Sequence, residues 1–350
     1  LGSPAVDAGD DTAISLAQDI TGQARIQEGA VDLGAYEGGI RPVLYVDADA
    51  TGDGNGSSWA DAYPHLQDAL SASTGTDQIW IAAGTYYPDE GASVTDDDRG
   101  ASFTVAGSND GLKIYGGFSG TESALAERDL GAGYQTILSG DIDQNDDLFA
   151  PQVDSDGSPD TPTQTDHING SNSYHVLIFD GGDALGSNVA ANVTPATLLD
   201  GVTITGGQAN GSSADAQGGG LFCDGEGSSN VCSPQVTNVV FTGNAAGLGG
   251  AVFSTGRYSG TSSPIITNAI FAGNAASGFS SSSGGAIFST GSNGVSSPQV
   301  INATFAGNTA MREGGAIYST GSDGTSSPQI VNTILWGNAA TISGDEVANN

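Results

Sequence analysis

The chain has 350 residues, with 40 acidic residues against seven basic ones and a formal net charge of −33 at pH 7. A surface of this charge repels phosphates, so nucleic acid and anionic membrane surfaces are not expected partners. The sequence has no run of about 18 apolar residues, and membrane insertion is therefore not expected either. The 55 glycines and the low content of charged residues (13%) are typical of the turns of a solenoid.

Three parts are predicted along the chain: an N-terminal segment over 1–42, an N-terminal cap over 43–78 and a solenoid over 79–350. In the cap, Pro64 to Ala72 predicts a short amphipathic helix with Leu66, Ala69 and Leu70 on one face. A helix at this place covers the first coil and hides its open strand edges.

Acidic loops place oxygen ligands at alternate positions on flexible backbone, as Ca²⁺ prefers. The predicted ligands are Asp141, Asp143, Asn145 and Asp147 in one loop and Asp154 and Asp156 in the next, and Asp47, Asp49 and Asp53 form a similar loop earlier in the chain. None of these is an EF-hand, and the alternative is that they are solvated acidic loops. We expect Ca²⁺ in at least one of them, with the Asp141 loop as first choice, and no organic cofactor.

The two cysteines, Cys223 and Cys232, lie nine residues apart. In an extracellular protein this spacing favours a local disulfide that clamps the loop between them. Two thiols without a nearby histidine are too few ligands for a metal site.

A phrase of about 30 residues occurs four times between residues 218 and 342. Each copy opens with Ser-Pro, places Asn four residues after the proline and then reaches Gly-Asn, and a Gly-Gly phrase with a short apolar run interleaves with it. The prolines are Pro234, Pro264, Pro298 and Pro328. The phrases are too short for helices and lack a 3.6-residue period, so they predict short strands that stack from one copy to the next.

Such stacking predicts an all-β fold, a parallel β-helix, and a right-handed one, because parallel crossover connections are overwhelmingly of that hand. Equivalent side chains then form columns, here Val236, Ile266, Val300 and Ile330, and also Phe253, Phe288 and Tyr318. Asparagine at a turn can bond its neighbours above and below while it tolerates left-handed backbone. The predicted asparagine ladder is Asn238, Asn268, Asn302 and Asn332.

Two resemblances follow from these residues. Phe241 to Asn244, Phe271 to Asn274 and Phe305 to Asn308, which alternate with the Gly-Gly phrases, resemble the paired FxxN and GGAI repeats of polymorphic outer-membrane adhesins. The fourth copy departs from this pattern, with Leu335 in place of phenylalanine. Tyr45 to Trp59 and Ile79 to Tyr86 resemble the opening of secreted bacterial β-helix proteins of the pectate-lyase-like superfamily. These resemblances imply a secreted bacterial protein that is extracellular or on the cell surface.

The first 42 residues include Ser3 to Asp10 and Val31 to Glu37, which resemble a terminal phrase that in this family follows the last coil. Here the phrase comes first, while the chain ends at Asn350 directly after a coil. An uncovered coil leaves strand edges unpaired. We therefore expect the N-terminal segment to pack on the last coil of a neighbouring subunit in a head-to-tail filament, the alternative being a fragment or tandem module of a longer protein. The expected interface residues are Pro4, Val6, Leu33, Tyr36, Leu335 and Trp336.

The pectate-lyase-like superfamily includes polysaccharide lyases and hydrolases, but no catalytic residue is predicted here. The basic residues are scattered outside the lyase pattern, and His65, His167 and His175 lack the Gly-His-Gly context of the hydrolases. The sequence therefore favours a non-enzymatic structural protein of a surface or matrix filament, such as a biofilm fibre. The alternative is an adhesin or a carbohydrate-binding module for surface polysaccharide, with Trp59, Trp80 and Trp336 as candidate sugar contacts.

Overall fold

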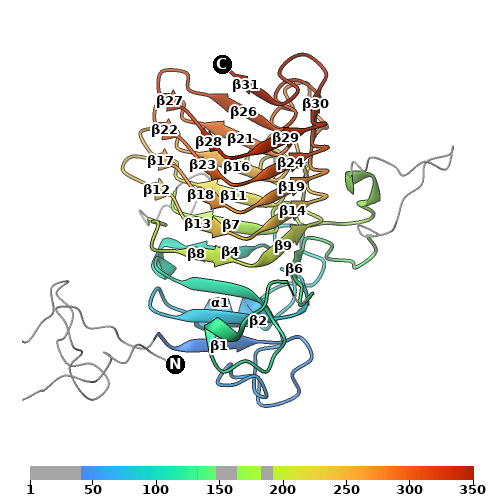
Figure 1. Ribbon diagram of the computed structural model, residues 1–350, viewed down its shortest axis with the longest axis vertical. Coiled ribbons are helices and arrows are strands. Elements are labelled where there is room, and N and C mark those ends of the chain that lie inside the picture. Colours follow the sequence, from blue (N-terminus) through green and yellow to red (C-terminus); the bar gives the residue numbers. More distant parts are fainter. Residues whose placement is uncertain (1–40, 132, 147–163, 183–191) are drawn as a thin grey trace, which may run out of the picture. The chain divides into compact units, whose positions relative to one another are not determined.

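The computed structural model describes residues 41–131, 133–146, 164–182 and 192–350. The larger compact unit, residues 43–122 and 128–350, is a parallel β-solenoid whose coils follow one another from β1 to β31 (Figure 1). The predicted all-β, parallel fold is confirmed, and its longest sheet has eight strands.

Three long sheets form the sides of the solenoid. Sheet 1 contains β1 (Val43–Val46), β2 (Gln78–Ala82), β5 (Lys113–Phe118), β8 (Leu198–Asp200), β13 (Gln235–Thr237), β18 (Ile265–Thr267), β23 (Gln299–Ile301) and β28 (Gln329–Val331). Sheet 2 contains β3 (Gly84–Tyr86), β6 (Thr136–Ser139), β9 (Val202–Thr205), β14 (Val240–Thr242), β19 (Ile270–Ala272), β24 (Thr304–Ala306) and β29 (Ile334–Trp336). Sheet 3 contains β4 (Phe103–Ala106), β7 (Leu177–Asp180), β11 (Leu221–Asp224), β16 (Val252–Thr255), β21 (Ile287–Thr290), β26 (Ile317–Thr320) and β31 (Val347–Asn349).

Two narrow sheets of two-residue strands fill the corners. One contains β10 (Gln208–Ala209), β15 (Ala245–Ala246), β20 (Ala275–Ala276), β25 (Thr309–Ala310) and β30 (Ala339–Ala340), and the other contains β12 (Val231–Cys232), β17 (Thr261–Ser262), β22 (Val295–Ser296) and β27 (Thr325–Ser326). Short 3₁₀ turns occur at η2 (Gly107–Asn109), η3 (Leu125–Glu127), η4 (Gln164–His167) and η5 (Ser213–Ala216).

The predicted helix is present as α1 (Leu66–Ala72), and its buried residues are the three expected, Leu66, Ala69 and Leu70. It packs against β1, β2 and β4. Because β4 is the edge strand of sheet 3, the helix covers an open edge at the end of the solenoid where the coils begin.

The core is built from columns of like side chains, because the repeats place the same residue at the same register. Val236, Ile266 and Val300 are paired in sheet 1 and buried. In sheet 2 the rings of Phe241, Phe271 and Phe305 stack with centroids 4.9 and 4.4 Å apart. The predicted column of Phe253, Phe288 and Tyr318 also exists, but it belongs to a second apolar cluster, separate from the main core.

The predicted disulfide joins Cys223 and Cys232, and it is the first rung of a polar column inside the solenoid. In the next coil the paired positions are Ser254 and Ser262, whose hydroxyl oxygens lie 2.8 Å apart. One coil further, Ser289 and Ser296 are 2.9 Å apart. The covalent bond therefore occupies the place that hydrogen-bonded serines occupy in the following coils.

Candidate functional site

The predicted asparagine ladder lies at the corner between sheets 1 and 2. Asn238, Asn268 and Asn302 each have φ of 54°, and Asn332 has φ of 50°, so all four residues are in the left-handed region that asparagine tolerates. The amide of Asn268 donates to Asn238 Oδ1 at 3.3 Å, and that of Asn302 donates to Asn268 Oδ1 at 3.4 Å. We call these four residues the corner asparagines.

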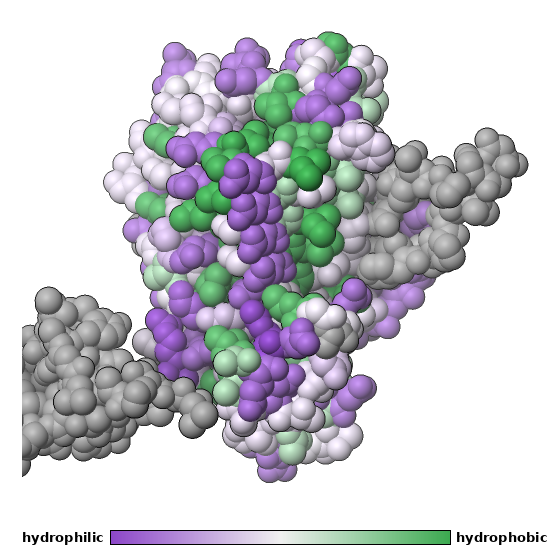
Figure 2. All heavy atoms as spheres, viewed as in Figure 1, coloured by the Kyte–Doolittle hydropathy of each residue, from purple (hydrophilic) through white to green (hydrophobic). Residues whose placement is uncertain are grey.

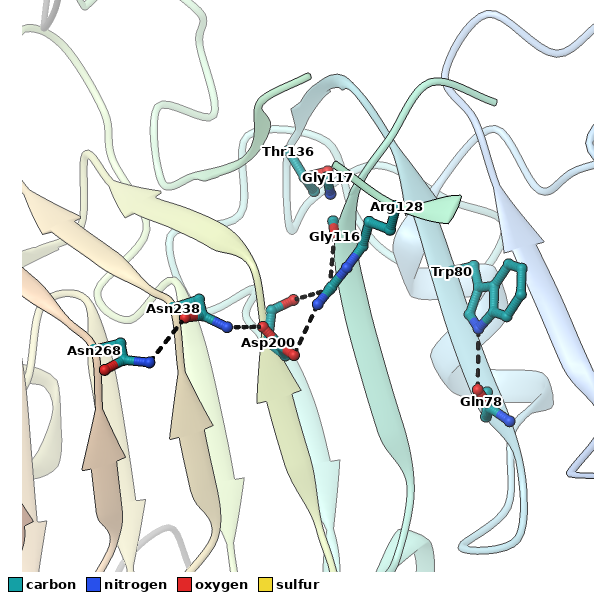
Figure 3. A network of polar contacts seen from close by, with 9 residues as sticks. All are labelled: Gln78, Trp80, Gly116, Gly117, Arg128, Thr136, Asp200, Asn238 and Asn268. Carbon is teal, nitrogen blue, oxygen red and sulfur yellow. Dashed lines mark hydrogen bonds and ion pairs between the residues drawn. The ribbon is translucent and has the colours of Figure 1, made fainter. Parts of the chain in front are cut away.

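The corner column begins at an ion pair (Figure 3). Asn238 donates to Asp200 Oδ1 at 2.8 Å, and Asp200 Oδ2 lies 2.9 Å from Arg128 Nη2. The side chains of Arg128 and Asp200 are only 10% and 12% exposed, and Arg128 also donates to the carbonyl of Gly116 at 3.0 Å. The Arg128 guanidinium therefore links neighbouring coils. The amide groups of the corner asparagines are oriented toward the carboxylate of Asp200.

A second asparagine column, whose members the sequence shows only as part of the repeat, lies inside the solenoid. Its members come from the Gly-Asn pairs and are Asn244, Asn274, Asn308 and Asn338, all buried. The amide of each of the first three donates to the Oδ1 of the next asparagine, at 3.0, 2.9 and 2.8 Å along the column, and that of Asn338 donates to Glu346. We call them the interior asparagines. The sequence signal for them is the fixed step of three residues from Phe241, Phe271 and Phe305 to the following asparagine. The side chains at both ends of this step are buried.

A hollow of about 290 Å³ lies beside the corner asparagines. Its lining includes Asn238 and Asn268 together with Leu130, Tyr134 and Ile270, whose side chains are 45, 43 and 46% exposed. Figure 2 shows a row of hydrophilic side chains along this corner with hydrophobic side chains on both sides. The surface therefore combines amide groups with exposed apolar and aromatic area.

The first-choice calcium loop is held together by its own hydrogen bonds. Asp141 Oδ1 accepts from the main-chain N–H of Asn145 at 3.0 Å and Oδ2 from that of Asp146 at 2.9 Å. Asp143 Oδ2 accepts from the N–H of Ser171 at 2.8 Å. Burial raises the pKa of Asp141, and the neighbouring Asp143 acts in the same direction. Asp147, Asp154 and Asp156 lie outside the described residues.

The predicted interface residues of the last coil are placed as follows. Leu335 pairs with Phe305 and packs on the core while it stays half-buried, and Trp336 is 72% exposed. Pro4, Val6, Leu33 and Tyr36 lie outside the described residues. The other two tryptophans contact other residues of the chain. Trp80 stacks on Phe118 with ring centroids 4.8 Å apart and donates to Gln78 (Figure 3). Trp59 donates to the carbonyl of Glu122.

The histidine that packs in the solenoid wall has a structural environment. His175 is 3% exposed, and its Nδ1 lies 3.0 Å from the carbonyl oxygen of Gly218. Burial lowers the pKa of this imidazole, so it is neutral at physiological pH. Its ring packs against Phe222.

Comparison with known families gives one match. The sequence profile of the Chlamydia polymorphic membrane protein repeat matches residues 302–320, which contain Phe305 and Asn308 and the Gly-Gly-Ala-Ile phrase at 314–317. No curated protein and no solved structure matched the chain. In the described part of the chain, no helix is both long and apolar enough to cross a membrane.

The match and the fold together indicate a repeat protein similar to the surface adhesins to which the sequence was likened. The match covers part of one repeat, and within it Phe305 and Asn308 are the buried side chains of the ring stack and the interior asparagine column. The likeness of the earlier coils to the pectate-lyase-like proteins and that of the first 42 residues to a terminal segment stay predictions.

Proposed function

We propose that the chain is a non-enzymatic, extracellular structural solenoid that assembles end to end into a surface or matrix filament. The observation that carries the proposal is the state of its last coil. Phe305 is fully buried, whereas Leu335, one coil further in the same column, is half-buried, and Ile334 beside it is 63% exposed. The strands β28, β29 and β31 are the last in their sheets among the described residues.

A coil edge of this kind accepts another coil by parallel strand addition, either from further chain or from a second copy. We favour the second copy, because its first 42 residues resemble a segment that follows the last coil in the family to which the sequence is similar. Strands added at this coil would continue the columns of the three long sheets. The charge of −33 opposes this association. Assembly should therefore strengthen with ionic strength, since salt shortens the range of the repulsion to roughly 10 Å at 0.1 M.

The non-enzymatic part of the proposal is supported by the chemistry of the hollow beside the corner asparagines. Its lining contains Tyr134 as the one titratable residue, with no carboxylate, imidazole, amine or guanidinium. Arg128 lies in an ion pair and His175 is buried. An acid and base placed on either side of a substrate, as glycosidic hydrolysis requires, is not found in this hollow.

The same hollow supports a second candidate function, the binding of surface polysaccharide. Tyr134 offers an exposed ring for a sugar face, and the corner amides of Asn238 and Asn268 offer donors and acceptors for hydroxyl groups. Binding of a bacterial polysaccharide panel to the intact chain, compared with a Tyr134→Ala variant, tests this candidate. Equal binding by both proteins would remove it.

The filament proposal is tested by sedimentation velocity and negative-stain electron microscopy over a range of protein and salt concentrations. We expect concentration-dependent rods in the wild type and monomers in Leu335→Asp, which places a charge on the stacking surface. The matched control is Ile270→Asp, a change of the same kind at an exposed position in the middle of sheet 2. Emission from Trp336 should shift to shorter wavelength on assembly, because its ring is exposed in the single chain. Monomers in the wild type at every concentration would contradict the proposal.

A further inference from the structure

Three carboxylates meet in the loop that connects β3 and β4, away from the acidic loops favoured by the sequence. Asp89, Asp96 and Asp97 each offer an oxygen, and these oxygens all lie within 4.8 Å of one another. Asp89 is 4% exposed, whereas Asp96 and Asp97 are exposed. The cluster therefore has one buried carboxylate, that of Asp89, and two carboxylates that face solvent.

The buried carboxylate has an unpaired oxygen. Asp89 Oδ2 accepts from the main-chain N–H of Asp97 at 3.0 Å, but Asp89 Oδ1 has no hydrogen-bond partner among the described residues. A buried oxygen of this kind costs free energy unless a donor or a cation satisfies it. Burial raises the pKa of Asp89, and the charges of Glu90 and Asp96 act in the same direction. Among the described residues, the three carboxylates thus have no positively charged partner.

The neighbouring side chains that could supply a positive charge are engaged elsewhere. The Nε of Arg99, two residues after Asp97, donates to the carbonyl of Asn172 at 2.7 Å, and its guanidinium lies over the ring of Tyr174 at 4.5 Å. His65 lies 3.4 Å from Glu90, outside the cluster. None of the four ion pairs found in the described residues includes a carboxylate of the cluster.

We propose that Asp89, Asp96 and Asp97 bind a calcium ion. Ca²⁺ takes six to eight oxygen ligands in flexible geometry, so the carboxylates supply the protein side and water completes the shell on the exposed face. The absence of sulfur or nitrogen donors from the cluster disfavours Zn²⁺. With three protein side chains, the site belongs with the extracellular modules that bind Ca²⁺ at about 10⁻⁴ to 10⁻³ M.

The bound ion would fasten the loop that lies against the capping helix. The side chain of Gln67 in α1 donates to the carbonyl of Pro88, next to Asp89, and Asp68 of α1 accepts from the N–H of Ala92 at 2.9 Å. An ion that ties Asp89 to Asp96 and Asp97 closes the loop whose first residues hold α1. Calcium should therefore stabilise the end of the solenoid that α1 covers.

The test is calcium titration of the metal-free chain by isothermal calorimetry, with thermal unfolding measured in chelator and in 10 mM CaCl₂. Wild type should bind with a dissociation constant of about 0.1 to 1 mM and unfold at higher temperature with calcium. Asp89→Asn keeps the acceptor for the N–H of Asp97 and removes the charge. It should lose at least tenfold in affinity and show no calcium-dependent shift, while its unfolding temperature in chelator equals or exceeds that of wild type.

Two variants complete the design. Asp98→Asn changes an exposed carboxylate of the same loop that accepts from the N–H of Gly100 at 2.8 Å, and it should bind like wild type. Asp141→Asn reports on the other acidic loop and should also bind like wild type. Loss of binding in Asp141→Asn with unchanged binding in Asp89→Asn would move the ion to the other loop and overturn the proposal. No heat and no thermal shift in the wild type at 10 mM calcium would overturn it as well.

Discussion

The repeat coils from residue 218 to 342 and the coils before them share one fold but differ in the regularity of their register and in the length of their loops. In the repeat coils equivalent positions carry like residues, and the register from β13 to β28 is continuous. In the earlier coils the register between β2 and β5 shifts between Trp80 and Ala82, and long loops leave the wall, such as the one between Tyr86 and Phe103. In the repeat coils, the repetition stacks like side chains from coil to coil. In the irregular coils, long loops bring carboxylates together.

The largest effect of breaking this stacking is expected at the interior asparagines. In Asn274→Ala, the buried N–H of Asn244 and the carbonyl of Phe241 lose their bonds to the Asn274 side chain. Because an unpaired buried polar group costs about 1–3 kcal/mol, we expect a loss of about 3–4 kcal/mol in the free energy of unfolding. Urea unfolding followed by circular dichroism measures it. A loss below that of the corresponding change at Asn268 would show that the interior column is not the main polar contribution.

The disulfide rung offers a comparison within one column. Replacing Cys223 and Cys232 by alanine should cost about 2–3 kcal/mol, the value that loop-closure entropy gives for a loop of this length. Replacing both by serine recreates the rung found at Ser254 and Ser262, so this variant should be about 1 kcal/mol more stable than the double alanine variant. The urea midpoints of wild type, the double alanine variant and the double serine variant measure these differences in stability. Equal midpoints for the two variants would mean that the serine pairs contribute nothing measurable.

The corner asparagines should be less sensitive. Asn268 has φ of 54°, and its side chain is exposed, so Asn268→Ala is expected to cost about 1 kcal/mol, mostly for left-handed backbone. Asn268→Gly removes the same side chain without that backbone cost and should cost only a few tenths of a kcal/mol. If both variants lost the same stability, the exposed hydrogen bonds rather than the backbone conformation would be responsible.

The sequence was sufficient for the fold because a fixed period determines the register, and the register determines which side chains stack. Helix α1 and the disulfide followed from local pattern in the same way. The sequence pattern alone did not distinguish the two asparagines of each repeat, because Asn238 and Asn244 recur with the same spacing. They differ only in the side of the wall to which they point. That choice depends on the left-handed residue at the corner, which reverses the alternation of side chains.

The positions of the acidic side chains were harder to predict, for a different reason. Alternating carboxylates predicted calcium ligands at Asp141 and Asp143. Both side chains accept hydrogen bonds from main-chain N–H groups, and calcium binding by this loop stays a prediction. Asp89 and Asp97 are separated by a loop whose path no periodic pattern describes, and the burial of Asp89 depends on that path. Arg99 directly follows three aspartates in the sequence, but its side chain contacts Asn172 and Gln208 on later coils.

A further expected effect concerns pH and again separates the two regions. Burial, with the charges of Asp141 and Asp143 in addition, raises the pKa of Asp146 from its ordinary value of 3.8 to about 6. Between these values the unfolded chain has released the proton and the folded chain still holds it, so the contribution of Asp146 to stability falls as pH rises from about 4 to 6. Asp146→Asn should remove this fall, so its unfolding temperature relative to wild type should rise across that window. Since the repeat coils carry few ionisable groups, Asn308→Ala should shift the unfolding temperature by the same amount at pH 4.5 and pH 7. A difference between wild type and Asp146→Asn that stays constant with pH would show that the pKa of Asp146 is the same in the folded and the unfolded chain.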